Sequence, residues 1–142
     1  MFGLFKKKAP LARQISVNEN LTDKTAALLH LQLMICRNQP GYLAGLDSSY
    51  VRGYLVGYFD CSLQKLGQPV HSDEEFVTLL LRGHALLLND DIGNTQGYTF
   101  ASLRLQGDPQ FAQGQADGGR DCDDSLKNDR QPMTLMRRFM EG

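Results

Sequence analysis

The sequence predicts an all-α fold, and three features lead to this prediction. Stretches with apolar residues at helical spacing recur along the chain, and residues that favour helix starts precede several of them. Proline or glycine follows these stretches and ends them. One residue pattern also occurs twice, in residues 50–61 and 111–122, which indicates an internal duplication. We therefore expect a compact bundle of four or five main helices built from two similar helical hairpins.

The first part of the chain is expected to contain an arm and then a buried helix. Residues 1–19 mix lysine, proline and polar residues without a period, so we expect a flexible arm, followed by a single domain over 20–142. A helix is predicted at about 23–37, where AALLHLQLMIC places apolar residues on nearly every side, as in a buried helix. Pro40 and Gly41 cannot continue it.

Two further helices complete the first half and begin the second. One is predicted at about 49–66, and Gly67 ends it. The next, at about 72–88, opens on a capping box formed by Ser72 and Glu75. The repeated halves then span about 21–69 and 76–132.

The last third of the chain is expected to be helical as well. Residues 98–106, YTFASLRLQ, fit either a helix or a short strand, and we favour a helix because the surrounding segments are helical. A further helix should begin with Asp108 as its cap and Pro109 at its first position, and reach about residue 128. Residues 133–141 are predicted to form a helix that covers the end of the bundle.

The repeated pattern aligns small residues four positions apart on two helices. The two strips are Gly53, Gly57 and Cys61, and Gly114, Gly118 and Cys122. A glycine inside a helix destabilises it by about 1 kcal/mol relative to alanine, so a close contact must offset that cost. We expect the two repeated helices to cross each other at these strips, or each to cross its hairpin partner.

The repeat also aligns polar residues that could bind a metal. Asp60 and Asp121 lie close to the glycine faces, where a buried carboxylate would need hydrogen-bond donors, so we favour a structural role over a functional one. With His30 and His84 they are candidate zinc or iron ligands. No H-E-x-x-H or C-x-x-C motif anchors such a site, so we assign no metal and no cofactor.

Composition argues against several partners. The chain has 15 basic and 16 acidic residues, a balance that does not favour nucleic acid. It lacks the roughly 18 to 20 consecutive apolar residues that span a bilayer, so we expect no stable membrane association. Its three cysteines form no C-x-x-C pair, which favours reduced thiols and a cytoplasmic location.

These absences favour a non-catalytic protein that binds another protein, with no catalytic residues assigned. The partner could be a second copy, joined through a glycine strip or the last helix. The candidate contact residues are side chains expected at the surface: Tyr42, Tyr54, Tyr58, Tyr98, Met136 and Phe139, with Phe59 and Phe100 beside them. The alternatives are a small metal-dependent enzyme and a small-molecule binder with a pocket between the hairpins.

Overall fold

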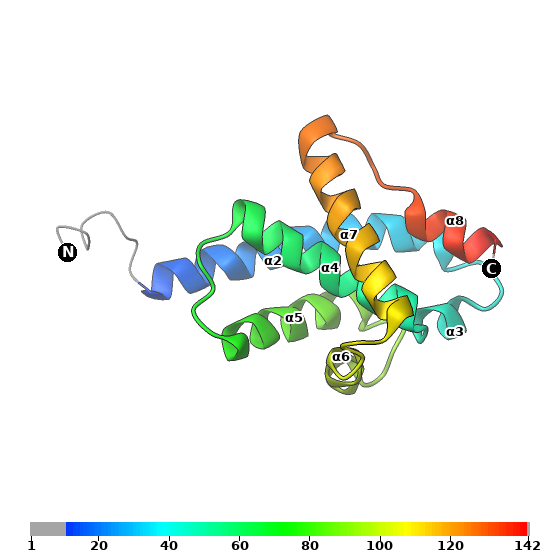
Figure 1. The fold of residues 1–142 in the computed structure, drawn as a ribbon, viewed down its shortest axis with the longest axis horizontal. Coiled ribbons are helices and arrows are strands. Elements are labelled where there is room, and N and C mark those ends of the chain that lie inside the picture. Colours follow the sequence, from blue (N-terminus) through cyan, green and yellow to red (C-terminus); the bar gives the residue numbers. More distant parts are fainter. Residues whose placement is uncertain (1–10, 142) are drawn as a thin grey trace.

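The computed structural model describes residues 11–141, which form seven helices and no strand (Figure 1). The all-α prediction is therefore confirmed for this part of the chain. The helices are α2 (Leu11–Cys36), α3 (Tyr42–Leu46), α4 (Ser49–Leu66), α5 (Asp73–Leu88), α6 (Thr95–Leu103), α7 (Pro109–Asn128) and α8 (Thr134–Glu141).

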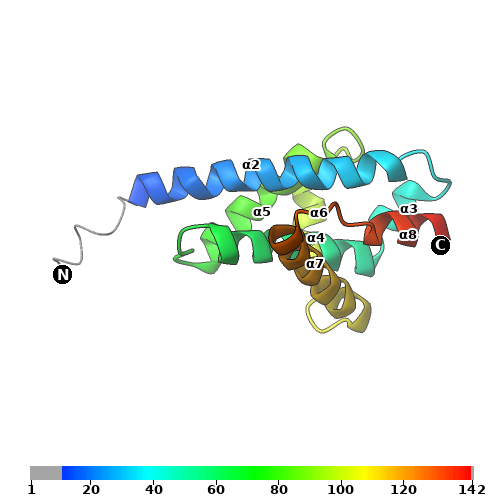
Figure 2. The same cartoon turned by 90° about the horizontal axis from the view of Figure 1, so that it is seen from above.

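Helix α2 begins at Leu11, well before the predicted start near residue 23, and runs along one edge of the molecule (Figure 2). The prediction of a flexible arm through residue 19 is therefore wrong for residues 11–19, while residues 1–10 lie outside the described part. A specific contact holds the early turns of α2. The buried Asn18 side chain donates to the carbonyl of Gln68 at 3.1 Å and accepts from its N–H at 2.8 Å.

Helix starts follow the predicted capping chemistry closely. The Ser72 hydroxyl accepts from the Glu75 N–H at 3.1 Å and begins α5. The Asp108 carboxylate accepts from two backbone N–H groups, and Pro109 occupies the first position of α7. Residues 95–103 form a helix, so the preference for a helix over a strand in this region is confirmed.

Helix α3 was not expected, because the region after Pro40 has the composition of a loop. Its first residue follows Gly41, which adopts a φ of 81°, a left-handed conformation that glycine reaches at little cost. The helix is short, with only five residues. It places Tyr42 and Leu46 in the core.

Helix α4 occupies the centre of the fold. Among the described helices, α4 and α7 form the most extensive contact. Helix α4 also contacts α2, α3, α5 and α6. Figure 1 shows α7 crossing over α4. Helix α5 lies along α2, and α8 packs on α2 through the buried Leu135. The largest fully buried side chains include Tyr54, Phe59 and Phe111, so the core lies where α4 meets its neighbours.

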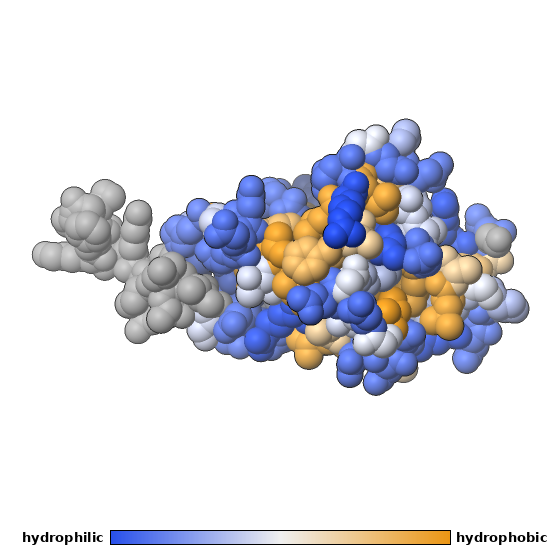
Figure 3. All heavy atoms as spheres, turned by 90° about the horizontal axis from the view of Figure 1, so that it is seen from below, coloured by the Kyte–Doolittle hydropathy of each residue, from blue (hydrophilic) through white to orange (hydrophobic). Residues whose placement is uncertain are grey.

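The surface mixes polar and apolar side chains. Figure 3 shows the face that carries α5 and α6, where apolar areas alternate with polar ones. Among the described residues, no helix combines the length and apolar character that crossing a bilayer requires.

Candidate interaction surface

The aligned glycines lie where α4 and α7 cross. A methyl group at Gly53 would overlap the carbonyl oxygen of Phe111, and one at Gly114 would overlap that of Tyr50. One turn further on, Gly57 meets the carbonyl of Gln115. The missing side chains therefore allow backbone to touch backbone, an approach in which glycine Cα–H groups face carbonyl oxygens.

The contact at this crossing is reciprocal. Residue 111 follows residue 50 by the repeat distance of 61 positions, and residue 114 follows residue 53 by the same distance. Gly53 against Phe111 and Gly114 against Tyr50 are thus the same contact seen from each helix. Gly118 against the Tyr54 carbonyl matches Gly57 against Gln115 in the same way. The two helices run in the same direction through the crossing.

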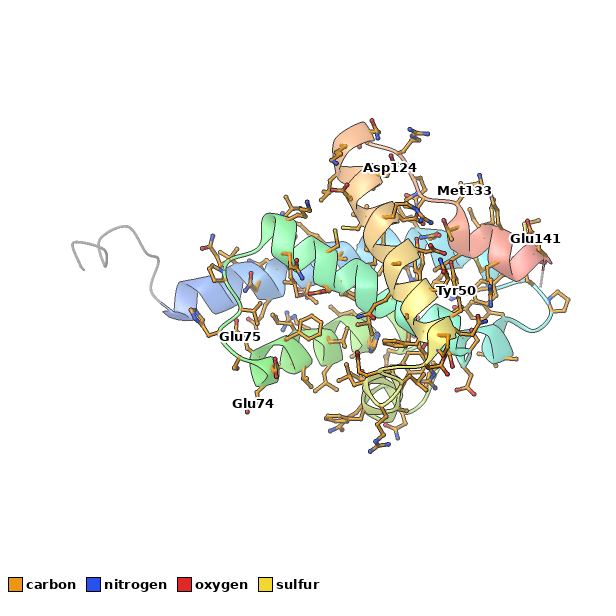
Figure 4. The ribbon with its side chains drawn as sticks, in the orientation of Figure 1. Tyr50, Glu74, Glu75, Asp124, Met133 and Glu141 are labelled. Carbon is orange, nitrogen blue, oxygen red and sulfur yellow. The ribbon has the colours of Figure 1, made fainter. Side chains whose placement is uncertain are left out.

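Hydrogen bonds beside the glycines join the two helices further. Tyr50 lies at the crossing (Figure 4) and donates its hydroxyl to Asp117 at 2.6 Å. Burial alone would raise the pKa of Asp117, but hydrogen bonds from Tyr50, Gln113 and Arg120 outweigh it and lower the pKa. Arg138 of α8 lies over the Tyr50 ring, 4.1 Å from its centroid. Sequence reasoning missed Asp117, because its counterpart in the repeat is an apolar residue.

A second hydrogen-bonded chain passes from α7 through α4 to α2. The buried Tyr54 hydroxyl donates to Asp121 at 2.6 Å and accepts from Gln32 at 3.2 Å. Gln32 in turn accepts from the Leu135 N–H at the start of α8 at 3.0 Å. Burial and the bond to Asp121 both raise the pKa of Tyr54, so the phenol stays protonated and donates. This chain ties four helices together.

The two repeated aspartates have different surroundings. Asp121 accepts an interhelical bond from Tyr54, as a structural carboxylate would. Asp60 accepts only from Gln64 of its own helix, at 3.0 Å, in an exposed position. The residue that would correspond to Tyr54 in α7 is Gln115, which has no phenol to offer Asp60.

The candidate metal ligands do not converge. His30 contacts Arg37 at 3.3 Å, and the two aspartates have the separate partners described above. Within residues 11–141 no three histidine, cysteine or acidic side chains are grouped so that they could hold a metal ion.

His84 lies in the core rather than in a site open to ligands. Its Nδ1 is 2.6 Å from the Thr99 hydroxyl, and its ring packs edge-on against Phe59 and Tyr98. Burial, helped by the charge of Arg52, lowers the pKa of His84 to about 3. The imidazole is therefore neutral near pH 7, and a buried neutral ring of this kind stabilises packing.

The predicted contact residues are almost all buried, which corrects the expectation that they lie on the surface. Tyr54 is fully buried, Met136 is half-buried against the core, and Phe100 on α6 is the exposed member of the set. The others, each less than one tenth exposed, are Tyr42, Tyr58, Phe59, Tyr98 and Phe139. They are buried because α4 is central and α3, α6 and α8 pack around it or against α2.

Both surfaces suggested for dimerisation are used inside the chain. The glycine strips contact each other across α4 and α7. The apolar side of α8 packs inward, with Leu135 fully buried and the Phe139 ring centroid 5.3 Å from that of Tyr42. The glycine strips and the inward side of α8 are therefore not free for a second copy, while Met133 and Met140 remain exposed.

A hollow of about 770 Å³ lies where the two predicted halves join, between the end of α4 and the start of α5. Leu63, Val70 and Phe76 give it apolar walls, and Asp60 and Gln64 line it as well.

The outer face of α2 carries a row of exposed apolar side chains. Its large side chains are half-exposed: Leu28 at 48%, and Leu31, Met34 and Ile35 each at 51%. Each lies three or four positions from another member of the set, so they share one side of the helix. We call these four residues the α2 outer face. The prediction of a buried helix is therefore wrong for this side, although the apolar residues all around the helix were the signal for it.

Two ion pairs join α2 and the residue after it to α5 and the turn that follows α5. Arg82 binds Asp23 at 2.7 Å near the middle of α2, and Arg37 binds Asp91 at 3.0 Å at its end. The hydrogen bond to Arg82 lowers the pKa of Asp23 despite partial burial. On α5, the side chain of Leu86 is also half-exposed.

Comparisons of the chain with protein-family models, curated proteins and solved structures found no match.

Proposed function

We propose that this is a non-catalytic protein-binding module whose contact surface is the α2 outer face, and that the partner is a second copy of the chain. The observation that supports this is the row of four half-exposed apolar side chains on one side of one helix. Such side chains form an area on the order of a few hundred Å², the size of the largest patch on most monomers and often a functional one.

Three features favour a second copy as the partner. A straight apolar row is self-complementary when two helices pack antiparallel. The formal net charge of −1 gives little repulsion between copies. An antiparallel pair centred on Leu31 would also bring the exposed Lys24 of one copy toward Asp90 of the other, at the end of α5.

The interaction should be weak. Roughly 300 Å² of apolar area from each copy, at about 25 cal/mol per Å², gives on the order of 15 kcal/mol before association costs of about 4 to 15 kcal/mol. A dissociation constant in the micromolar range or weaker is therefore expected, well short of a permanent dimer.

Sedimentation equilibrium over a wide concentration range tests the proposal. The wild-type chain should show a reversible monomer–dimer equilibrium, and Leu31→Glu or Ile35→Glu should shift it at least tenfold toward monomer, because a charge would be buried in the contact. The matched control is Leu126→Glu on α7, which is 44% exposed and outside the face, and it should leave the equilibrium unchanged.

Two results would overturn the proposal. A wild-type chain that stays monomeric at all concentrations would exclude a second copy as the partner. A dimer that persists in both α2 variants would place the contact elsewhere. Far-ultraviolet circular dichroism of each variant checks that the helices remain folded.

We also infer that the two halves arose by internal duplication. We further infer that the protein acts in the cytoplasm. The reciprocal contacts of the glycines, which follow the repeat distance, support the duplication. The three cysteines are free thiols in the structure, which supports a reducing compartment.

A further inference from the structure

The repeat places its two cysteines opposite each other. Each follows the second glycine of its helix by four positions and so continues the strip that forms the crossing. Because α4 and α7 run in the same direction and contact each other at the repeat distance, residue 61 faces residue 122. The Cys61 thiol is close enough to that of Cys122 to influence its pKa, which agrees with this placement.

The two thiols differ in their access to solvent. Cys61 is half-buried and lines a shallow groove between α4 and α7, together with Gly57 and Gly119. Cys122 is only 2% exposed. Burial and the neighbouring sulfur of Cys61 raise the pKa of Cys122, so this thiol does not react first. A small oxidant reaches Cys61 from the groove, and the nearest second thiol is Cys122.

We propose that Cys61 and Cys122 form a reversible disulfide that locks the crossing of α4 and α7 when the cell's pool of small thiols becomes oxidised. Cys36, the third cysteine, lies on α2 with its thiol directed to the Gln32 carbonyl at 3.4 Å, and takes no part.

The chemistry needs only a low-molecular-weight disulfide such as oxidised glutathione. The Cys61 thiolate attacks one sulfur of that disulfide, whose S–S bond breaks, and one glutathione leaves as a thiolate that takes up a proton. The Cys122 thiol then loses its proton to solvent and attacks the Cys61 sulfur, and the second glutathione leaves. Two protein thiols are oxidised and one small disulfide is reduced to two thiols.

A lock at this position would act mainly on α7. Among the described helices, α7 packs extensively only on α4, whereas α4 is held by four other helices as well. A bond between the two would therefore restrict opening of α7 and leave α2 and α5 largely as they are. Opening of a region held by few other contacts is the kind of motion that a crosslink suppresses.

Incubation of the native protein with a glutathione redox series tests the proposal, with intact mass and peptide mapping as readouts. Oxidised wild type should lose two hydrogens and give one linked peptide pair containing Cys61 and Cys122. Cys61→Ser and Cys122→Ser should each abolish the link, whereas the control Cys36→Ser should keep it. Hydrogen exchange of α7 amides should slow on oxidation, with α5 amides unchanged.

Other outcomes would overturn the proposal. These are three free thiols after equilibration with the oxidised buffer, a glutathione adduct retained on Cys61 without a link, and a link that involves Cys36. The wild-type peptide map alone distinguishes these outcomes from the expected one, so poor folding of a cysteine variant does not obscure the result.

Discussion

Helices α4 and α7 carry the same pattern of glycines but have opposite surroundings. Most of the 18 residues of α4 are buried, among them the arginine Arg52, while α7 buries five of its 20 residues. Helix α4 is enclosed by neighbours, and α7 lies across it on the outside (Figure 1). The repeated residues thus form the one contact that both helices share. The remaining residues differ because the surroundings of the two helices differ.

The difference extends to the side chains that accompany the glycines. On α4 the positions beside the strip are tyrosines, which fit between apolar neighbours and still donate hydrogen bonds. On α7 the equivalent positions include Gln115, which borders the open groove between the helices. The shared contact is symmetric in its backbone and asymmetric in its hydrogen bonds.

The largest effect is expected from filling the crossing. Gly53→Ala and Gly114→Ala should each lower the free energy of unfolding by about 3 kcal/mol, even though alanine favours a helix by about 1 kcal/mol, because the methyl group meets a backbone carbonyl that cannot move alone. Urea denaturation measures both. Equal losses would show that the contact is the same from each side.

A third glycine on α7 provides the control. The nearest atom to a methyl group at Gly119 would be the Gly57 carbonyl oxygen at 4.0 Å, an ordinary contact. Gly119→Ala should therefore raise stability by about 1 kcal/mol. A loss similar to that of Gly114→Ala would contradict the steric explanation.

The next effect concerns the inner side of α4, where Phe59 packs against His84. The folded-state pKa of His84 is lowered to about 3, below the ordinary value of 6.5, so the unfolded chain binds a proton that the folded chain does not. The stabilisation of the folded state by neutral His84 is complete above pH 6.5 and is lost as the pH falls toward 3. We expect a loss of about 2 kcal/mol at pH 5 relative to pH 7.

His84→Phe isolates this contribution, because phenylalanine keeps a ring between Phe59 and Tyr98. Its stability at pH 7 falls through loss of the Thr99 hydrogen bond, but its change between pH 7 and pH 5 should be about 2 kcal/mol smaller than in the wild type. Urea titrations at the two pH values measure it. If the unfolding free energy of the variant changes between pH 7 and pH 5 as much as that of the wild type, His84 is not the group that causes the pH dependence.

The smallest changes in stability are expected at Asp121 and Asp60, which occupy equivalent positions in the repeat. Asp121→Ala removes the acceptor of the buried Tyr54 hydroxyl and should cost about 2 kcal/mol. Asp60→Ala removes only an exposed bond to Gln64 and should change stability by less than about 0.5 kcal/mol. Thermal unfolding of the two variants side by side gives the difference. Equal costs would mean that Asp60 also supports the crossing.

Local chemistry in the sequence predicted most of the helices and the caps of α5 and α7. Ser72 and Asp108 cap as expected, since capping depends on residues within one turn. The spacing of Gly53 and Gly57 pointed to a close helix contact, because glycine inside a helix is costly without one. The start of α2 could not be predicted, since Asn18 is held by the backbone of Gln68, 50 residues away.

The sequence also did not predict which faces of the helices are exposed to solvent. Tyr54 and Tyr58 of α4 were expected at the surface, but Tyr54 can be buried because its hydroxyl donates to the carboxylate of Asp121 on α7. Conversely, the α2 outer face looked buried because it is apolar. Which side of an apolar helix meets solvent depends on how many neighbours the whole fold supplies.

The parallel course of α4 and α7 has a further consequence. Two helices on separate chains could make the same contact, but here α5 and α6 return the chain and tether one helix to the other. Tethering of this kind raises the effective concentration of each helix for the other to about the millimolar range. The glycine contact can therefore be too weak to assemble free partners and still be fully formed within one chain.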